Sequence, residues 1–274
     1  MTLLAILAGT LAAGIGSVWL AAALSFGALG RYTQHMLSMA AGALLATAFM
    51  HLLPEAFESQ AGSRELFMAL LIGLVFFFLL DKAELWHHGH EHHHDHGHDH
   101  GHSAHDHHAH AGTHDHAKDA PQRPAGVWAL LAGDSVHCFG DGVLIASAFM
   151  ADMRLGAIAS LAVLAHEVPH HMGDLVVVVR SGAGNRRAAF VKVSLAGALT
   201  ALGGLCGYWL VDQLQDYLPF FLVAASSSFI YVALADLIPQ LQKRLSARET
   251  TAQISWLLAG IVLVTAVSSL AHAH

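Results

Sequence analysis

Residues 134–142 read Asp-Ser-Val-His-Cys-Phe-Gly-Asp-Gly, and residues 166–174 read His-Glu-Val-Pro-His-His-Met-Gly-Asp. Both motifs lie in otherwise apolar segments that are long enough to form helices. Side chains four residues apart share a helix face. The pairs with this spacing are His137 with Asp141, His166 with His170, and Glu167 with His171. Carboxylates and imidazoles inside apolar helices are costly unless something binds them, and a divalent cation such as zinc would bind this set.

The composition is that of a membrane protein. Of 274 residues, 55% are hydrophobic and 12% are charged, whereas soluble domains have about 25% charged residues. The net charge of −7 is shared among loops and buried positions, so we expect no nucleic-acid partner. Both cysteines, Cys138 and Cys206, lie in apolar segments, which argues against a disulfide framework. The lipid bilayer is therefore the expected environment.

The apolar segments predict an all-α polytopic protein with eight transmembrane helices. The predicted spans are 3–26, 36–57, 64–85, 127–150, 155–179, 188–211, 218–240 and 252–271. Three helices in residues 1–86 and five in residues 126–274 flank a long polar insert at 87–125. The first segment is too long for a signal peptide and has no basic residues before it, so we interpret it as a span.

The positions of the basic residues predict the orientation. Eleven of the 13 Lys and Arg residues follow odd-numbered spans, and only Arg64 and Arg154 lie on the other side. The positive-inside rule then puts the insert in the cytoplasm and both termini outside it. A short chain of this kind is expected in a bacterial inner membrane.

The insert is rich in histidine. Between His87 and His116 lie 16 of the 24 histidines, alternating with Asp, Gly and Ala. The segment has no apolar periodicity, so we predict disorder in the absence of metal. Two interpretations stay open, a loose multi-site metal binder and a solvated linker.

The second and seventh spans end in related motifs. The first reads His51-Leu-Leu-Pro54-Glu55, and the second reads Asp236-Leu-Ile-Pro239-Gln240. The two spans run in opposite directions, so the match indicates an inverted repeat, which is typical of transporters. The alternative is that proline simply ends helices at the interface. We expect His51, Glu55 and Glu58 at the outer mouth, and Asp236 on the cytoplasmic side.

The topology predicts the depth of the polar residues. Antiparallel fourth and fifth spans bring His137 level with His170, and Asp141 level with His166, near the membrane midplane. We expect the remaining polar residues to continue toward the cytoplasm. These are Asp134, Glu167, His171 and Asp174.

These motifs resemble those of the ZIP (Zrt-, Irt-like) family of divalent metal transporters. The family pattern His-Asn-Phe-x-Asp-Gly appears as residues 137–142, and the LIV-1-type pattern His-Glu-x-Pro-His-Glu-x-Gly-Asp as residues 166–174. The resemblance implies eight helices and elevator-type transport of zinc, or of iron, manganese or cadmium, into the cytoplasm. It also implies a primary site of His137, His166 and His170 with Asp141 close by. The metal is then the substrate, with no cofactor and no enzymatic activity.

Two positions depart from the family patterns. Cys138 replaces Asn and His171 replaces Glu, and the sixth span has no carboxylate between Val193 and Val211. The last absence argues against a second, carboxylate-bridged metal. Cys138 is open to interpretation as a soft ligand or as inert packing, and His171 as a ligand or an exit-path residue.

Rival functions also need to be considered. Residues 166–170 match the zincin motif His-Glu-x-x-His, so an intramembrane zinc metalloprotease is the enzyme alternative, with Glu167 as general base and Asp141 as third ligand. A protease would not need the additional His137 or the insert. A cation-efflux carrier of another fold typically has a soluble C-terminal domain, and only three residues follow the last predicted span here. The sequence leaves a homodimer open.

Overall fold

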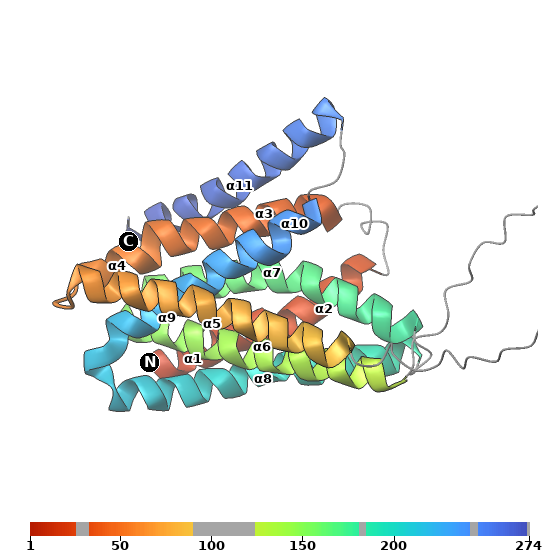
Figure 1. Ribbon diagram of the computed structural model, residues 1–274, viewed down its shortest axis with the longest axis horizontal. Helices are drawn as coiled ribbons and strands as arrows, with labels where there is room; N and C mark the ends of the chain where they lie inside the picture. Colours follow the sequence, from red (N-terminus) through yellow and green to blue (C-terminus); the bar gives the residue numbers. More distant parts are fainter. Residues whose placement is uncertain (26–32, 90–123, 181–184, 242–245, 273–274) are drawn as a thin grey trace, which may run out of the picture.

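The computed structural model describes residues 1–25, 33–89, 124–180, 185–241 and 246–272 (Figure 1). Within these ranges every regular element is a helix, which confirms the predicted all-α class. The predicted insert at 87–125 lies almost entirely outside the described residues, which resume at 124.

The described residues form eight helical rods, one for each predicted span. The first three rods are α1 (Thr2–Leu11), η1 (Ala12–Gly16) and α2 (Ser17–Ser25); α3 (Thr33–Thr47), η3 (Ala48–Leu52) and α4 (Leu53–Phe57); and α5 (Ser63–Gly89). The next three are α6 (Pro124–Ala151), α7 (Met153–Arg180) and α8 (Arg186–Gln213). The seventh is η5 (Gln215–Tyr217), α9 (Leu218–Tyr231), η6 (Val232–Leu237) and α10 (Ile238–Leu241), and the eighth is α11 (Ala247–His272).

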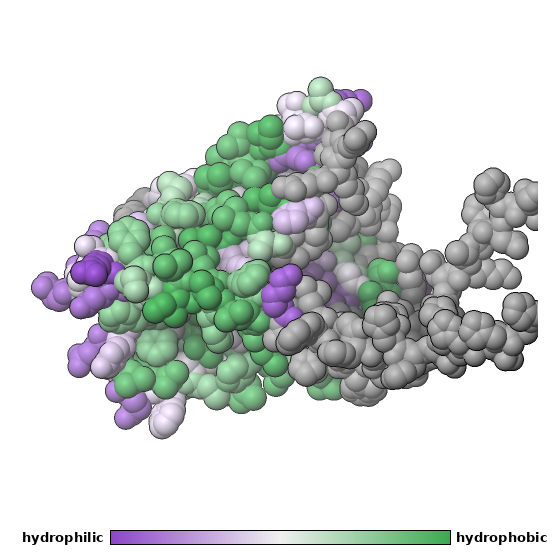
Figure 2. All heavy atoms as spheres, in the orientation of Figure 1, coloured by the Kyte–Doolittle hydropathy of each residue, from purple (hydrophilic) through white to green (hydrophobic). Residues whose placement is uncertain are grey.

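Six of the rods are apolar and long enough to cross a membrane by length and composition. The other two, α6 and α7, are 28 residues each but contain the acidic and imidazole groups of the two motifs. Large apolar side chains also face outward, for example Phe67, Leu71 and Phe76 on α5, which are 56–60% exposed. Figure 2 shows this apolar surface across the middle of the visible face, with hydrophilic residues at the left end, at the upper right tip and beside the grey residues. Such a surface fits lipid contact.

Glycines bring two pairs of helices into backbone contact. A Cβ at Gly142 of α6 would collide with the carbonyl oxygen of Thr200, and one at Gly203 of α8 with that of Phe139. The same relation joins Gly42 of α3 to the carbonyl oxygen of Leu257 on α11. Small residues allow such close approach between membrane helices.

The second and seventh rods share an unusual local geometry. Each changes from α to π geometry and reaches a proline two residues later, η3 before Pro54 and η6 before Pro239. Proline has no amide hydrogen for the carbonyl four residues earlier, and π geometry is a local alternative to the missing bond. The rods run in opposite directions in Figure 1, in agreement with the predicted inverted repeat.

Candidate metal centre

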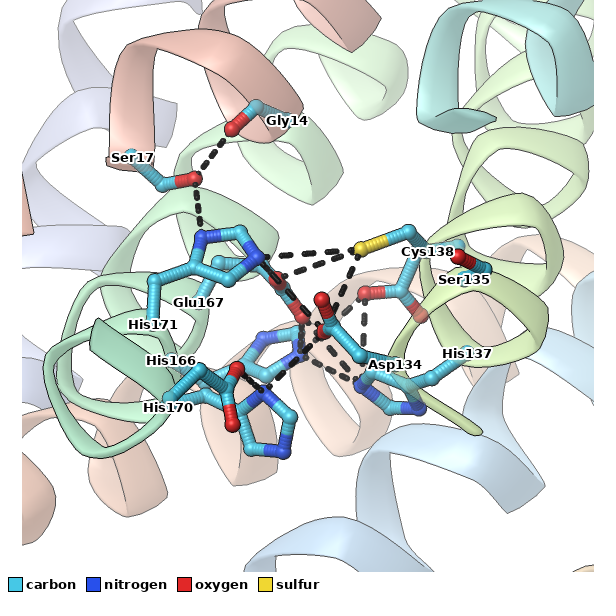
Figure 3. Close-up of polar contacts among 12 residues, drawn as sticks. Gly14, Ser17, Asp134, Ser135, His137, Cys138, His166, Glu167, His170 and His171 are labelled. Carbon is cyan, nitrogen blue, oxygen red and sulfur yellow. Dashed lines mark hydrogen bonds and ion pairs between the residues drawn. The ribbon is translucent and has the colours of Figure 1, made fainter. Parts of the chain in front are cut away.

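The two polar motifs meet at the middle of α6 and α7. His137 and His166 are each the fourteenth residue of a 28-residue helix. Only Asp152 separates α6 from α7, so the helices run antiparallel and their midpoints face each other. The i, i+4 spacing then aims several side chains from each helix into the space between them (Figure 3).

The first group of donors consists of His137, Asp141, His166 and Glu167. His166 Nε2 lies 3.1 Å from both Asp141 Oδ2 and Glu167 Oε1. His137 Nε2 lies 3.2 Å from the same Glu167 oxygen and 3.4 Å from His166 Nε2. A tetrahedral zinc ion with nitrogen and oxygen ligands at about 2.0–2.1 Å holds those ligands about 3.4 Å apart. The spacing of the first group therefore fits one zinc ion.

The first group is also buried, and its carboxylate oxygens lack hydrogen-bond donors. The side chains of Asp141, His166 and Glu167 are at most 3% exposed, whereas His137 is 30% exposed. Neither Asp141 Oδ2 nor Glu167 Oε1 has a properly aligned hydrogen-bond donor among the described residues. Buried carboxylate oxygens without donors are costly, and a cation between them and the imidazole nitrogens removes that cost.

The second group consists of Asp134, Cys138, Glu167 and His171, all of them buried. Cys138 Sγ lies 3.7 Å from Asp134 Oδ1, 3.7 Å from Glu167 Oε2 and 3.8 Å from His171 Nε2. His171 Nε2 is 3.1 Å from Glu167 Oε2. Glu167 therefore contributes one oxygen to each of the first two groups.

The third group consists of Asp134, His170, His171 and Asp174. His170 Nδ1 lies 3.4 Å from Asp134 Oδ1 and 3.5 Å from Asp174 Oδ2, and its side chain is 37% exposed. His171 Nε2 and Asp134 Oδ1, 3.6 Å apart, belong to both the second and the third group. The three groups thus overlap in a chain along the two helices.

Two histidines are oriented through the ring nitrogen that faces away from these groups. His166 Nδ1 lies 3.3 Å from the carbonyl oxygen of Ala162, one turn earlier on α7. His171 Nδ1 lies 3.0 Å from the hydroxyl of Ser17 in the first rod. Such outer partners fix the tautomer and the ring direction of a metal-binding histidine. Sequence analysis did not identify Ser17, because a single hydroxyl in an apolar span gives no signal.

The structure divides the predicted site residues among the three groups. It brings His137, Asp141 and His166 together, but it adds Glu167 to them and places the His170 ring nitrogen Nδ1 with Asp134 and Asp174. The two histidines of the His-Glu-x-x-His motif consequently lie in different groups, an arrangement that does not favour a zincin site.

The predicted entrance and exit residues lie elsewhere. His51 is half-buried in η3, and Glu55 and Glu58 are exposed at the end of the second rod. The side chain of Asp236 lies outside the described residues.

Known proteins with sequences similar to this chain are zinc transporters. The family model described as "ZIP Zinc transporter" matches residues 81–268. A "Zinc transporter ZIP13 homolog" of Drosophila melanogaster is 27% identical over 86% of this chain and 77% of its own length. "Zinc transporter ZIP13" of Pongo abelii is 26% identical over 85% of this chain and 66% of its own length. Human "Zinc transporter ZIP4" is 36% identical over 42% of this chain, but the match covers only 18% of that longer protein.

The family match includes both ligand-bearing helices, four of the eight rods in full and most of the last one. The eight-rod fold, the outward-facing apolar surface and the donor groups on α6 and α7 agree with it. The chain therefore belongs to the ZIP family of zinc transporters.

Proposed function

We propose that this chain carries zinc across a membrane into the cytoplasm through the first donor group. The observation that supports this most strongly is the close spacing of His137, Asp141, His166 and Glu167, whose ligand atoms lie 3.1 to 3.9 Å apart in the pairs that the two antiparallel helices bring together at mid-length. Imidazole and carboxylate ligands favour zinc or iron over magnesium or calcium. The names of the relatives favour zinc, and manganese and cadmium remain candidates as further substrates. The ion is cargo in this proposal, and no cofactor is needed.

The three overlapping groups form a path for the metal. From His166 at mid-helix, the donors continue along α7 through His170 to Asp174, toward the end that precedes the connection at residues 181–185. The count of basic residues puts that connection and the insert in the cytoplasm. The third group is then the cytoplasmic exit, with Asp236 beyond it, while His51, Glu55 and Glu58 lie toward the outer mouth.

The movement that we propose is of the elevator type. The first rod, α6, α7 and α8 would move as one unit against the rods built from α3, α5, α9 and α11. Backbone contact between α6 and α8, and between α3 and α11, supports two units that are each packed tightly. The side chains of His137 and His170 are 30% and 37% exposed, so the ion can enter and leave the donor groups at these two residues.

The histidine-rich insert has a separate role in this proposal. Many closely spaced imidazoles, alternating with Asp and Gly in the sequence, should bind several ions loosely near the exit. Deleting residues 88–116 should leave initial zinc uptake into metal-free vesicles within about threefold of wild type, because the insert does not form the membrane path. Loss of uptake in a folded deletion variant would place the insert in the transport mechanism.

Zinc uptake into proteoliposomes that contain a zinc-sensitive dye tests the main proposal. His137→Ala and His166→Ala should reduce uptake to the level of empty vesicles, because each removes a ligand of the first group. His35→Ala is the matched control, since His35 stacks on Trp256 away from all three groups. Wild-type uptake by both site variants would refute the site. Cleavage of a membrane-spanning peptide without zinc uptake would instead support the protease alternative.

A further inference from the structure

A groove away from the metal centre lies between the first turns of α5 and the start of α9. Its volume is about 570 Å³, and none of its lining residues belongs to a donor group. The lining residues are Arg64, Glu65, Met68, Ala69 and Ile72 of α5 and Phe220 of α9. Both helices begin at the left end of the molecule in Figure 1. The groove therefore lies at one end of the membrane-spanning part.

The groove ends where α5 and α9 come into contact. A Cβ at Gly73 would collide with the Ser227 hydroxyl, and that hydroxyl lies 3.2 Å from the carbonyl oxygen of Leu70. On the N-terminal side of this contact, the lining residues of α5 recur every three or four positions, which puts them on one face of the helix. Met68 and Ile72 on this face are 52% and 63% exposed. The groove therefore presents an open apolar face between the two helices.

Two opposite charges stand at the outer end of this apolar face. Arg64 and Glu65 are both exposed, and neither side chain makes an ion pair within the part of the chain that the structure describes. Adjacent side chains on a helix point about 100° apart. The Glu65 carboxylate lies near Gly62, where an added Cβ would be 3.6 Å from Glu65 Cδ. The mouth of the groove therefore holds a cation and an anion that are not paired with each other.

We propose that this groove binds one phospholipid whose headgroup contains a phosphate and a primary ammonium. The Arg64 guanidinium donates two parallel hydrogen bonds to the phosphate, and the Glu65 carboxylate accepts a hydrogen bond from the ammonium. One acyl chain lies against Met68, Ile72 and Phe220. From Arg64 to Ile72 the helix rises about 12 Å. One leaflet contributes about 15 Å of hydrocarbon, so the apolar face covers most of its depth. This inference goes beyond the proposed transport function and does not depend on it.

The two charges select among headgroups. An anionic headgroup without a cation would pair with Arg64 but would place a second negative charge beside Glu65. A choline headgroup has the positive charge, but its quaternary nitrogen has no hydrogen to donate to the carboxylate. A primary ammonium supplies both the charge and the hydrogen, and hydrogen bonds between ionised groups are the strong ones. Phosphatidylethanolamine has this headgroup, so we expect it to bind more tightly than phosphatidylglycerol or phosphatidylcholine.

A second copy of the chain fits the groove less well than a lipid does. An apolar helix of another copy would cover Met68 and Ile72, but it would also cover the two charges at the mouth without a partner for either. Unpaired charges in apolar surroundings are costly. A phospholipid covers the apolar face and pairs with both charges. The charges therefore favour a lipid over a helix as the occupant.

Native mass spectrometry of the full chain in detergent, without added zinc, tests the proposal. Titration of the delipidated protein with phosphatidylethanolamine should give a saturable adduct of one lipid per chain. Phosphatidylcholine and phosphatidylglycerol with the same acyl chains should bind about tenfold more weakly, as expected for the loss of one hydrogen bond between charged groups. Arg64→Ala and Glu65→Gln should each weaken phosphatidylethanolamine binding by about the same factor. Arg154→Ala is the matched control, because Arg154 is an exposed arginine that does not line the groove.

Ala69→Trp tests the apolar part of the groove. The large side chain fills space beside Met68 and Ile72 without changing a charge, so lipid binding should fall by about tenfold, which corresponds to lost contact with about two CH₂ groups.

Several results would overturn the proposal. The absence of a saturable phosphatidylethanolamine adduct in wild type would do so without any variant, so misfolding of a variant cannot obscure the result. Equal binding of all three lipids would mean general contact with the bilayer, and tighter binding of phosphatidylglycerol would mean a site for anionic lipid. Dimers without bound lipid would mean that a second copy covers the groove. Wild-type binding by Arg64→Ala would remove the phosphate contact. Because no zinc is added, none of these results bears on the proposed transport function.

Discussion

Two pairs of rods in this molecule contain the polar motifs that were singled out in the sequence, yet the two pairs differ in geometry. The ligand pair, α6 and α7, remains regular α-helix over 28 residues each, even through Pro169. The π pair, formed by the rods 33–57 and 215–241, changes to π geometry just before Pro54 and Pro239. Proline alone therefore does not determine the geometry, and the surroundings of each helix decide the outcome.

The difference suggests a division of labour. In the ligand pair, close contacts between buried imidazoles and carboxylates join α6 to α7, and glycine contacts join α6 to α8. A bend would therefore separate the donors from one another. A metal site depends on such fixed positions. The π pair has no group of metal-binding side chains among the described residues, and its helices can bend without that loss. We expect variants of the ligand pair to change binding and variants of the π pair to change rates.

The largest effect is expected from Glu167→Gln. The amide removes one charged oxygen from each of the first two groups, because Oε1 serves the first and Oε2 the second. Zinc uptake in proteoliposomes should fall by about a hundredfold, a magnitude at the upper end for residues that support metal sites. Glu65→Gln on α5 is the control and should transport normally. Normal uptake by Glu167→Gln would show that the carboxylate does not join the two groups.

The next effect concerns the support of the ligand pair by α8. Gly142→Ala puts a methyl group against the carbonyl oxygen of Thr200, so it should lower the free energy of unfolding by about 1–3 kcal/mol. Gly140→Ala is the matched control two residues away, where no atom of the described residues lies within 4 Å. That variant should be neutral or stabilised by up to ~1 kcal/mol, as for glycine in a helix. Thermal unfolding in detergent measures both, and equal stability of the two variants would contradict the close contact.

The sequence predicted most of this fold because its signals are local. Apolar length identified all eight rods, and the i, i+4 rule paired His137 with Asp141 on one face. The position of Glu167 could not be predicted, because adjacent residues on a helix point about 100° apart and several rotations of α7 against α6 are possible. The position of His170 depends on the same rotation of α7, and the contact of Ser17 with His171 depends on how the first rod packs against α7. The π geometry could not be predicted from proline alone, because α7 stays a regular α-helix through Pro169 and η1 has π geometry without a proline.

A smaller effect should follow from changing the outer partner of His171. Ser17→Ala removes the hydroxyl that contacts His171 Nδ1 and orients the ring, so zinc uptake in proteoliposomes should fall by about tenfold, the lower end for outer partners of metal ligands. Ser147→Ala is the control, because Ser147 is equally buried and its hydroxyl bonds to the carbonyl oxygen of Val143 on its own helix. The dye assay in proteoliposomes measures zinc uptake by both variants. Equal uptake by the two variants would remove Ser17 from the metal centre.

The smallest effect is expected in the π pair. Pro54→Ala supplies an amide hydrogen four residues after the carbonyl of Met50, so an α-helical bond can form there and the segment Ala48–Leu52 should become stiffer. If bending there accompanies transport, the maximal uptake rate should fall by about threefold while the half-saturating zinc concentration stays unchanged. Pro219→Ala is the control, because Pro219 lies in the first turn of α9, where its missing amide hydrogen has no helical partner. Slower hydrogen exchange in residues 48–52 would verify that the helix has changed. A changed half-saturation with an unchanged maximal rate would mean that the π pair takes part in binding, and the division between the two pairs would be wrong.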